Sequence, residues 1–235
     1  MTVDPAESED RLLQAVLFDM DGTLVDTEPY WIAAEYALVE SYGGTWTDED
    51  ARSLIGNALP TSALYIRDRG GVPLSPDQII ERLLDEVIAA ARRAMPWRPG
   101  AVALLTQLAE RGVACALVTM SYARLAEAMT ALLPAGTFAA VVTGDQVADG
   151  KPHPEAYLTA AERLGADPAY CVAIEDSNTG IASAEAAGCV VVAVPHHVAI
   201  PPGAGRTLVQ SLVDLDPDGL EQIVRSRRTS VRAAR

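Results

Sequence analysis

The chain has 235 residues, of which 49% are hydrophobic and 21% charged, so it can bury a substantial core as one large domain or as a domain with an insertion. Its formal net charge of -14 and pI near 4.5 disfavour nucleic acid and anionic membranes as partners, because both require a basic surface. Residues 1–10 are acidic and polar, unlike a signal peptide, and no apolar run approaches the roughly 18 residues that span a bilayer.

The cysteine content points to a reducing compartment. Cys115, Cys171 and Cys189 fall in predicted core strands at irregular spacing, so we interpret them as small core hydrophobes. An odd number of buried thiols without metal-ligand spacing is typical of a cytoplasmic protein, which is the location we expect. We also expect a monomer or a weak homodimer.

The first predicted element is a short buried strand over residues 15–18, which stops at a polar turn. Asp19 lies at the end of this strand, and Asp21 follows in an Asp-Gly turn. Ligands of open parallel sheets bind outside the carboxyl ends of the strands, and two carboxylates there suit Mg²⁺. Solvated acids in an ordinary turn are the alternative, so this motif needs support from downstream.

Residues 28–97 change to a helical pattern without strands, which predicts a small all-helical cap domain. Capping boxes are predicted at Thr47 and at Ser75, and Gly56 and Asn57 are predicted to close the second helix. The predicted helices span 29–42, 47–55, 60–69 and 76–95.

The rest of the chain alternates strands and helices, which predicts a parallel sheet covered on both faces. Strands are predicted at 113–118, 139–143, 170–174 and 190–194, with helices at 98–111, 122–133, 154–164, 179–187 and 218–225. We therefore predict an α/β protein in which a Rossmann-like core, residues 1–27 and 98–235, is interrupted by the cap, residues 28–97.

The C-terminal stretch 225–235 carries five arginines and no acid. We interpret it as a frayed tail, and the run is short for the alternative, a nucleic-acid or membrane arm. His153, His196 and His197 lack zinc-ligand spacing, so we interpret them as loop residues, with His196 or His197 as candidates for the mouth of a pocket.

Further polar residues follow the other predicted strands, at the same edge of the sheet as Asp19. Thr119 and Ser121 follow one strand, Lys151 lies in a loop before a helix, and Glu175 and Asp176 follow another strand. Each alone has an ordinary interpretation as a strand end, a surface lysine or helix-start acids. Their convergence at one edge indicates an active site.

This set resembles the haloacid dehalogenase superfamily of phosphotransferases. The resemblance rests on residues 19–23, Asp-Met-Asp-Gly-Thr, on Thr119, on residues 150–152, Gly-Lys-Pro, and on residues 174–181, Ile-Glu-Asp-Ser-Asn-Thr-Gly-Ile. It covers the predicted core almost end to end, and the helical insert is similar to the small cap of that family. The resemblance implies a Rossmann-like fold and a Mg²⁺-dependent site.

The resemblance also implies a role for each residue. Asp19 is then the nucleophile that forms an aspartyl-phosphate, and Asp21 is the acid and base that protonates the leaving group and activates water. Thr119, Ser121 and Lys151 then bind the phosphoryl group. The expected Mg²⁺ ligands are Asp19, the Asp21 carbonyl, Asp176 and, directly or through water, Glu175.

Specificity is expected to lie in the cap, with Glu28, Trp31 and Asn57 as candidate substrate-binding residues. The nearest relatives by pattern are sugar-phosphate phosphatases and β-phosphoglucomutases. The mutases carry a histidine where this chain has Trp31, and an arginine in the cap loop where it has Leu59. Both differences favour a hydrolase over a mutase.

We therefore predict a Mg²⁺-dependent phosphatase of a small phosphomonoester, such as a sugar phosphate. A hexose-phosphate mutase is the alternative enzyme. A non-catalytic sensor of phosphorylated ligands is disfavoured, because a binding protein does not need the proton shuttle that Asp21 implies. The expected partner is a small phosphorylated metabolite.

Overall fold

The computed structural model describes residues 12–55, 57–203 and 205–233. Within these residues, six strands form one parallel sheet in the order β3-β2-β1-β4-β5-β6. The strands are β1 (Ala15–Phe18), β2 (Ala114–Val118), β3 (Ala140–Val142), β4 (Cys171–Glu175), β5 (Val190–Ala193) and β6 (Arg206–Leu208). The order reverses between β1 and β4, the position at which doubly wound sheets bind their ligands. The predicted α/β fold is confirmed.

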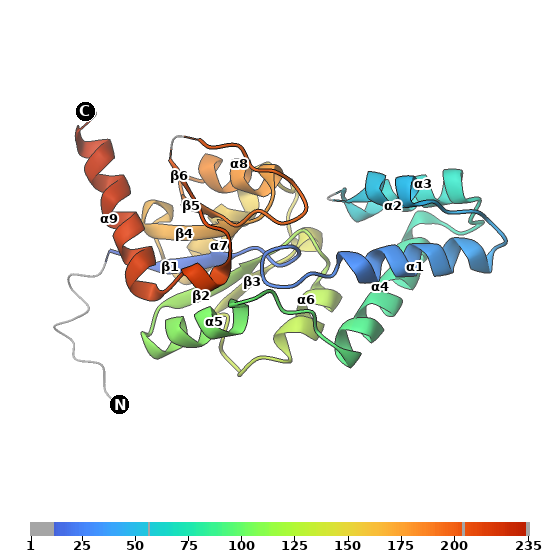
Figure 1. Cartoon of the computed structure of the whole chain (residues 1–235), viewed down its shortest axis with the longest axis horizontal. Coiled ribbons are helices and arrows are strands. Elements are labelled where there is room, and N and C mark those ends of the chain that lie inside the picture. Colours follow the sequence, from blue (N-terminus) through green and yellow to red (C-terminus); the bar gives the residue numbers. More distant parts are fainter. Residues whose placement is uncertain (1–11, 56, 204, 234–235) are drawn as a thin grey trace.

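The helices alternate with the strands except for one run of helices before β2 and for β5 and β6, between which the described residues form no helix (Figure 1). The helices are α1 (Glu28–Ser41), α2 (Asp48–Leu54), α3 (Leu59–Gly70), α4 (Pro76–Arg93), α5 (Ala101–Glu110), α6 (Ala123–Thr130), α7 (Glu155–Leu164), α8 (Asn178–Ala186) and α9 (Pro217–Ala233). The predicted capping boxes at Thr47 and Ser75 are both formed. Gly56, predicted to help close α2, lies outside the described residues.

The two faces of the sheet are buried by different helices. Side chains alternate along each strand, so Val16 and Phe18 of β1 lie in one apolar cluster, with α5, α6 and α9. Ala15 and Leu17 lie in the other, with α7 and α8. The strands are therefore apolar on both faces, which explains their continuous hydrophobic runs.

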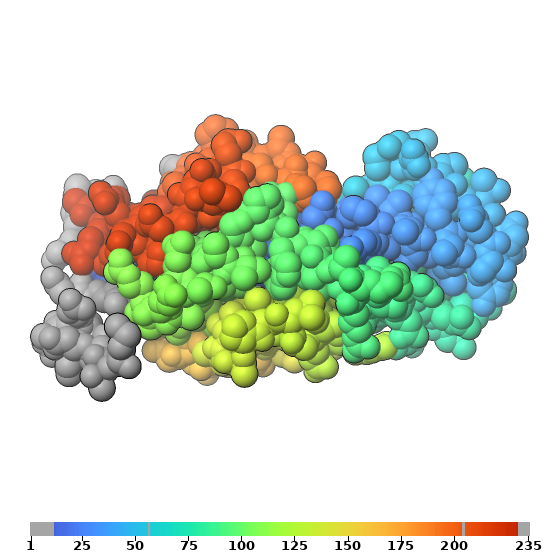
Figure 2. Space-filling model, turned by 60° about the horizontal axis from the view of Figure 1, so that its bottom comes forward, coloured from blue at the N-terminus to red at the C-terminus, as the bar shows by residue number. Residues whose placement is uncertain are grey.

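Helices α1–α4, the helical insert, lie beyond the carboxyl edge of the sheet, at the opposite end from α9 (Figure 1). The two segments that join the insert to the sheet run side by side, because Val25 and Trp97 form an antiparallel bridge and the Asp26 N–H donates to the Pro96 carbonyl at 2.9 Å. Helix α4 also packs beside α6, where Arg124 pairs with Asp85 at 2.6 Å (Figure 2). The insert is thus held at two places.

The C-terminal segment differs from its prediction. Helix α9 continues to Ala233, so residues 225–233, predicted to be a frayed tail, are helical. The helix buries Leu220 and Val224, and the Glu221 carboxylate accepts hydrogen bonds from the backbone N–H groups of Leu12 and Leu13. Strand β6 was not predicted either.

The cysteines and the helices agree with two further expectations. Cys115, Cys171 and Cys189 all lie in the described part of the chain, where they are buried and free of disulfide bonds. No helix in the described residues is both long enough and apolar enough to cross a membrane.

Candidate active site

The polar residues predicted at the strand ends lie together at the carboxyl edge of the sheet. Asp19 directly follows β1, Thr119 directly follows β2, and Glu175 is the last residue of β4. Hydrogen bonds and ion pairs link Lys151 to this group from the loop before α7. Parallel strands end at one edge, so residues distant in sequence meet there.

Lys151 joins the strand ends electrostatically. Its Nζ lies 2.7 Å from Asp19 Oδ1 and 2.6 Å from Glu175 Oε1, and it donates to a strand carbonyl, that of Val118, at 2.9 Å. Burial alone would lower the pKa of Lys151, but the two carboxylates outweigh it and raise that pKa. Lys151 therefore stays positively charged inside the site.

Asp19 presents one unused oxygen to the centre of the site. Asp19 Oδ1 accepts from Lys151, whereas its Oδ2 is buried without a hydrogen-bond partner among the described residues. An orphaned carboxylate oxygen is costly unless a ligand or a cation completes it. This oxygen is therefore available to a ligand or a cation.

Asp19, Glu175 and Asp176 form a group of carboxylates whose oxygens lie within 4.8 Å of one another. Burial and the neighbouring acids raise the pKa of Asp176 to about 9, and burial is the largest cause that raises the pKa of Asp19 to about 7. Lys151 supplies one positive charge beside these three carboxylates, so a bound cation would offset the remaining negative charge. Oxygen ligands of this kind suit a hard divalent cation, so the residues fit Mg²⁺.

Asp21 is held by three hydroxyl groups from two segments of the chain. It accepts from Ser121 Oγ at 2.7 Å, from Thr119 Oγ1 at 3.4 Å and from Thr27 Oγ1. None of these partners carries a charge, so the Asp21 carboxylate is oriented without being neutralised by an ion pair. A carboxyl group held in this way can exchange a proton with a bound reactant.

Two glycines leave room for the carboxylates. A Cβ on Gly22 would lie 2.0 Å from Asp176 Oδ2, and Gly22 also has a φ of +86°. A Cβ on Gly180 would lie 1.7 Å from Glu175 Oε1. Both positions require glycine because the backbone passes directly against an acidic side chain.

We expect Gly180→Ala to destabilise the protein, although Gly→Ala inside a helix usually stabilises by about 1 kcal/mol. The new methyl group displaces Glu175, which in turn releases Lys151. Urea unfolding should show a loss of about 1–3 kcal/mol, typical of overpacking. Thr179→Ala, an exposed change in the same helical turn, should be nearly neutral; a neutral Gly180→Ala would contradict the close approach.

The three residues predicted to bind substrate differ in their burial and in their contacts. Glu28 is half-buried at the start of α1, and burial raises its pKa to about 7, with His197 and Asp21 among the charges that act on it. Trp31 is half-buried against the apolar core. Asn57 is exposed, and its side chain donates to the Ser53 carbonyl at the end of α2. Substrate binding by these residues stays a prediction.

Sequence reasoning missed two residues that position the site. The hydroxyl of Tyr157, a fully buried residue of α7, donates to Glu175 Oε1 at 2.8 Å, and Lys151 lies over its ring. Thr27 donates to Asp21. Thr27 is a polar residue close after the acidic motif and could have been considered, whereas nothing in the sequence distinguishes Tyr157 from an ordinary core residue.

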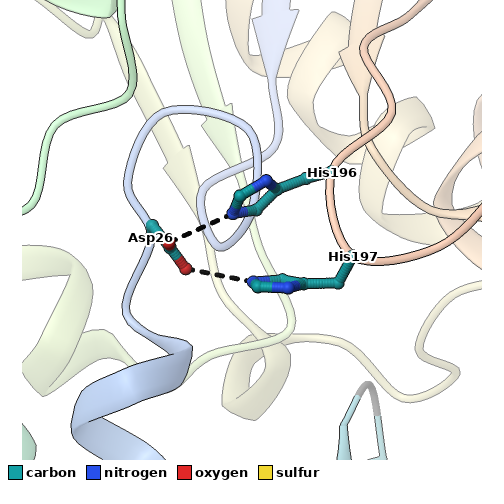
Figure 3. Close-up of side chains that lie close together, drawn as sticks. All are labelled: Asp26, His196 and His197. Atoms are coloured by element: carbon teal, nitrogen blue, oxygen red, sulfur yellow. Dashed lines mark hydrogen bonds and ion pairs between the residues drawn. The ribbon is translucent and has the colours of Figure 1, made fainter.

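A second polar cluster was also missed, although its histidines had been considered singly. Asp26, in the linker before α1, faces His196 and His197 of the loop after β5, whose ring centroids lie 3.9 Å apart (Figure 3). The distances are 3.2 Å from His196 Nε2 to Asp26 Oδ2 and 3.1 Å from His197 Nε2 to Asp26 Oδ1.

Comparison with known proteins agrees with this fold. A sequence profile of the haloacid dehalogenase-like hydrolase family matches residues 16–194. Hexitol phosphatase B of Escherichia coli (strain K12) is 30% identical over 195 residues, which cover 80% of this chain and 86% of that protein. A phosphorylated carbohydrates phosphatase of Thermotoga maritima is 35% identical over 183 residues, 75% of this chain and 82% of that protein.

Among solved structures, CbbY from Rhodobacter sphaeroides in complex with xylulose-(1,5)bisphosphate has a TM-score of 0.80 and 26% identity, covering 88% of this chain and 99% of that one. The protein is thus of the α/β class, with a parallel sheet, a charged site at its carboxyl edge and a helical insert after its first strand. The chain belongs to the haloacid dehalogenase-like hydrolase family.

Proposed function

We propose that the protein is a Mg²⁺-dependent phosphatase that hydrolyses a phosphorylated carbohydrate through an aspartyl-phosphate on Asp19. Its family and its named relatives make it a phosphoric monoester hydrolase. The observation that carries the mechanism is the buried Asp19 Oδ2, which lacks a hydrogen-bond partner in the described residues and lies beside a charged lysine.

The chemistry divides between two aspartates. Asp19 Oδ2 attacks the phosphorus atom, and Asp21 donates a proton to the departing oxygen of the sugar. Asp21, now deprotonated, takes a proton from water, which attacks the phosphorus and releases Asp19. The hydroxyl contacts to Asp21 keep its carboxyl group oriented through both steps.

The charges around Asp19 make the attack possible. Lys151 offsets the negative charge of Asp19 and of the transferred phosphoryl group, and Thr119 and Ser121 provide hydroxyl and backbone donors beside it. Asp19, Asp176 and the Asp21 carbonyl would hold Mg²⁺, whose positive charge allows an anionic phosphate to approach an anionic nucleophile. Glu175 contacts Lys151 and Tyr157, so positioning the lysine is its best supported role.

The helical insert, which we propose is a cap domain over residues 28–97, supplies specificity. The end of α2 lies on the side of the insert that faces the sheet (Figure 1), and Glu28 begins α1 close to the charges of the site. Closure of a cap excludes water from a transferring phosphoryl group. The relatives that are phosphatases of hexitols and phosphorylated carbohydrates support a sugar or sugar-alcohol phosphate as substrate.

The test is phosphate release from a panel of hexose, pentose and hexitol phosphates, with Mg²⁺ and with a chelator. We expect release that requires Mg²⁺ and is lost in Asp19→Asn. Conversion of one sugar phosphate to its isomer without phosphate release would instead establish a mutase. Release by Asp19→Asn at the wild-type rate would contradict the covalent mechanism.

Mg²⁺ should stabilise the fold increasingly as the pH rises. Because the pKa of Asp176 is raised from 3.8 to about 9, the metal-free folded state binds more protons than the unfolded chain between those values. Its free energy of unfolding therefore falls as the pH rises through that window, and bound Mg²⁺ removes this loss. The increase in melting temperature caused by Mg²⁺ should be larger at about pH 8.5 than at about pH 6.

Asp176→Asn is the matched control, because it keeps the shape of the side chain and removes the charge. Its melting temperature in chelator should depend less on pH than that of the wild type, and Mg²⁺ should raise it less. A Mg²⁺ effect of equal size at both pH values in the wild type would show that these carboxylates do not hold the ion.

A further inference from the structure

The cluster of Asp26, His196 and His197 joins two parts of the molecule. Asp26 lies in the linker that enters the helical insert, and its backbone N–H donates to Pro96 in the returning linker at 2.9 Å. The two histidines come from the loop after β5, and both rings point at the Asp26 carboxylate (Figure 3). One side-chain cluster therefore connects the sheet with both linkers of the insert.

The possible ligand atoms of this cluster lie close enough together to contact one cation. The Nε2 atoms of His196 and His197 lie 3.2 and 3.1 Å from the two Asp26 oxygens, and the ligand atoms can all be chosen within 4.8 Å of one another. A tetrahedral ion about 2.0–2.1 Å from nitrogen and oxygen places neighbouring ligand atoms about 3.3 Å apart. The two nitrogen–oxygen distances are already close to this spacing.

The environment of His196 Nε2 suits a bound cation better than a hydrogen bond to Asp26. Its Nε2 is buried and, despite its distance of 3.2 Å from Asp26, is without a well-aligned hydrogen-bond partner among the described residues. A buried imidazole nitrogen without such a partner is available to a metal ion.

One nearby charge opposes the binding of a cation, and others favour it. Arg98 faces His196 and opposes a cation, whereas Asp26 and Glu28 carry carboxylates toward the histidines. The side chains of the three cluster residues are between 21% and 35% exposed, so an ion can reach them from solvent.

We propose that Asp26, His196 and His197 form a second metal site, which takes a transition-metal ion such as Zn²⁺ and ties the linkers of the insert to the loop after β5. Two imidazoles and one carboxylate suit Zn²⁺, whereas the all-carboxylate group at Asp19 suits Mg²⁺. The chain thus carries two cation sites of different chemistry. The bound ion restricts movement of the insert relative to the sheet.

The test is Zn²⁺ binding by titration calorimetry to the full chain at about pH 7.5, with saturating Mg²⁺ to occupy the carboxylate group. We expect one equivalent to bind and to raise the melting temperature. His196→Gln and His197→Gln should each weaken binding by about 100-fold or more, since losing even a hydrogen-bonding partner behind a ligand costs about 10- to 100-fold. Co²⁺ should show the visible absorption of an imidazole-bound ion in the wild type only.

His153→Gln is the matched control, because His153 belongs to a separate and more exposed group of possible ligands, with Asp149 and Glu155. It should leave Zn²⁺ binding unchanged. Zn²⁺ affinity that is equal in the wild type and in the His196→Gln/His197→Gln double variant would overturn the proposal, as would Zn²⁺ that Mg²⁺ displaces. Far-UV circular dichroism of the metal-free variants verifies that they are folded.

Discussion

Asp21→Asn should lower the turnover of a sugar phosphate by about 10²–10⁴-fold, the contribution typical of general acid–base catalysis. The substitution keeps the shape of the side chain and one oxygen for the hydroxyl donors that surround it, so we expect little change in melting temperature. Steady-state phosphate release by the variant and the wild type measures the effect.

The choice of substrate makes this test specific for proton transfer. An aryl phosphate with a good leaving group needs no proton at the first step, so Asp21→Asn should release one equivalent of phenol rapidly and then stall with Asp19 phosphorylated. Ser121→Ala, which removes one hydroxyl contact to Asp21, should show a smaller loss and no burst. Wild-type turnover by Asp21→Asn would exclude the proposed role.

Lys151→Met should reduce both activity and stability. Glu175 is fully buried and Asp19 is nearly so, and both lose their positive partner. Breaking a buried ion pair costs about 3–5 kcal/mol, and losing one electrostatic group at a transferred phosphoryl group costs about 10²–10³ in turnover. Urea unfolding and phosphate release measure the two losses independently.

The stability loss should depend on pH in a defined direction. Lys151 lowers the pKa of Asp19, which burial raises to about 7, so in the variant that pKa rises further. Above about pH 7 the folded variant then binds more protons than the folded wild type, and it loses stability relative to the wild type as the pH increases. Lys151→Met/Glu175→Gln should recover much of the stability because it removes the fully buried one of the two unpaired carboxylates, but it should not recover activity. Equal stability of the single and double variants would show that the unpaired charge of Glu175 does not cause the loss of stability.

The sequence by itself determined the fold class and the group of residues at the strand ends. Apolar runs such as residues 15–18 are too short for helices and indicate strands buried on both faces, and polar residues follow three of them, at Asp19, Thr119 and Asp176. Because parallel strands end at one edge, the positions of Asp19, Thr119 and Asp176 were predictable without distances. Local signals also located the capping boxes of the insert.

Contacts between distant segments were decided only by the tertiary structure. Strand β6 is short and mixed in polarity, and it exists because β5 offers an open edge. The arginine-rich end forms a helix because Leu220 and Val224 find an apolar surface.

Contacts between distant segments also set the details of the active site at Asp19 and of the cluster at Asp26. Tyr157 supports Glu175 from another layer of the fold, and Asp26 meets histidines about 170 positions away. Sequence periodicity reports only which face of an element is buried; the partner of a polar group is set by how the layers pack. The free oxygen of Asp19 and the histidine pair around Asp26 were therefore visible only in the folded chain.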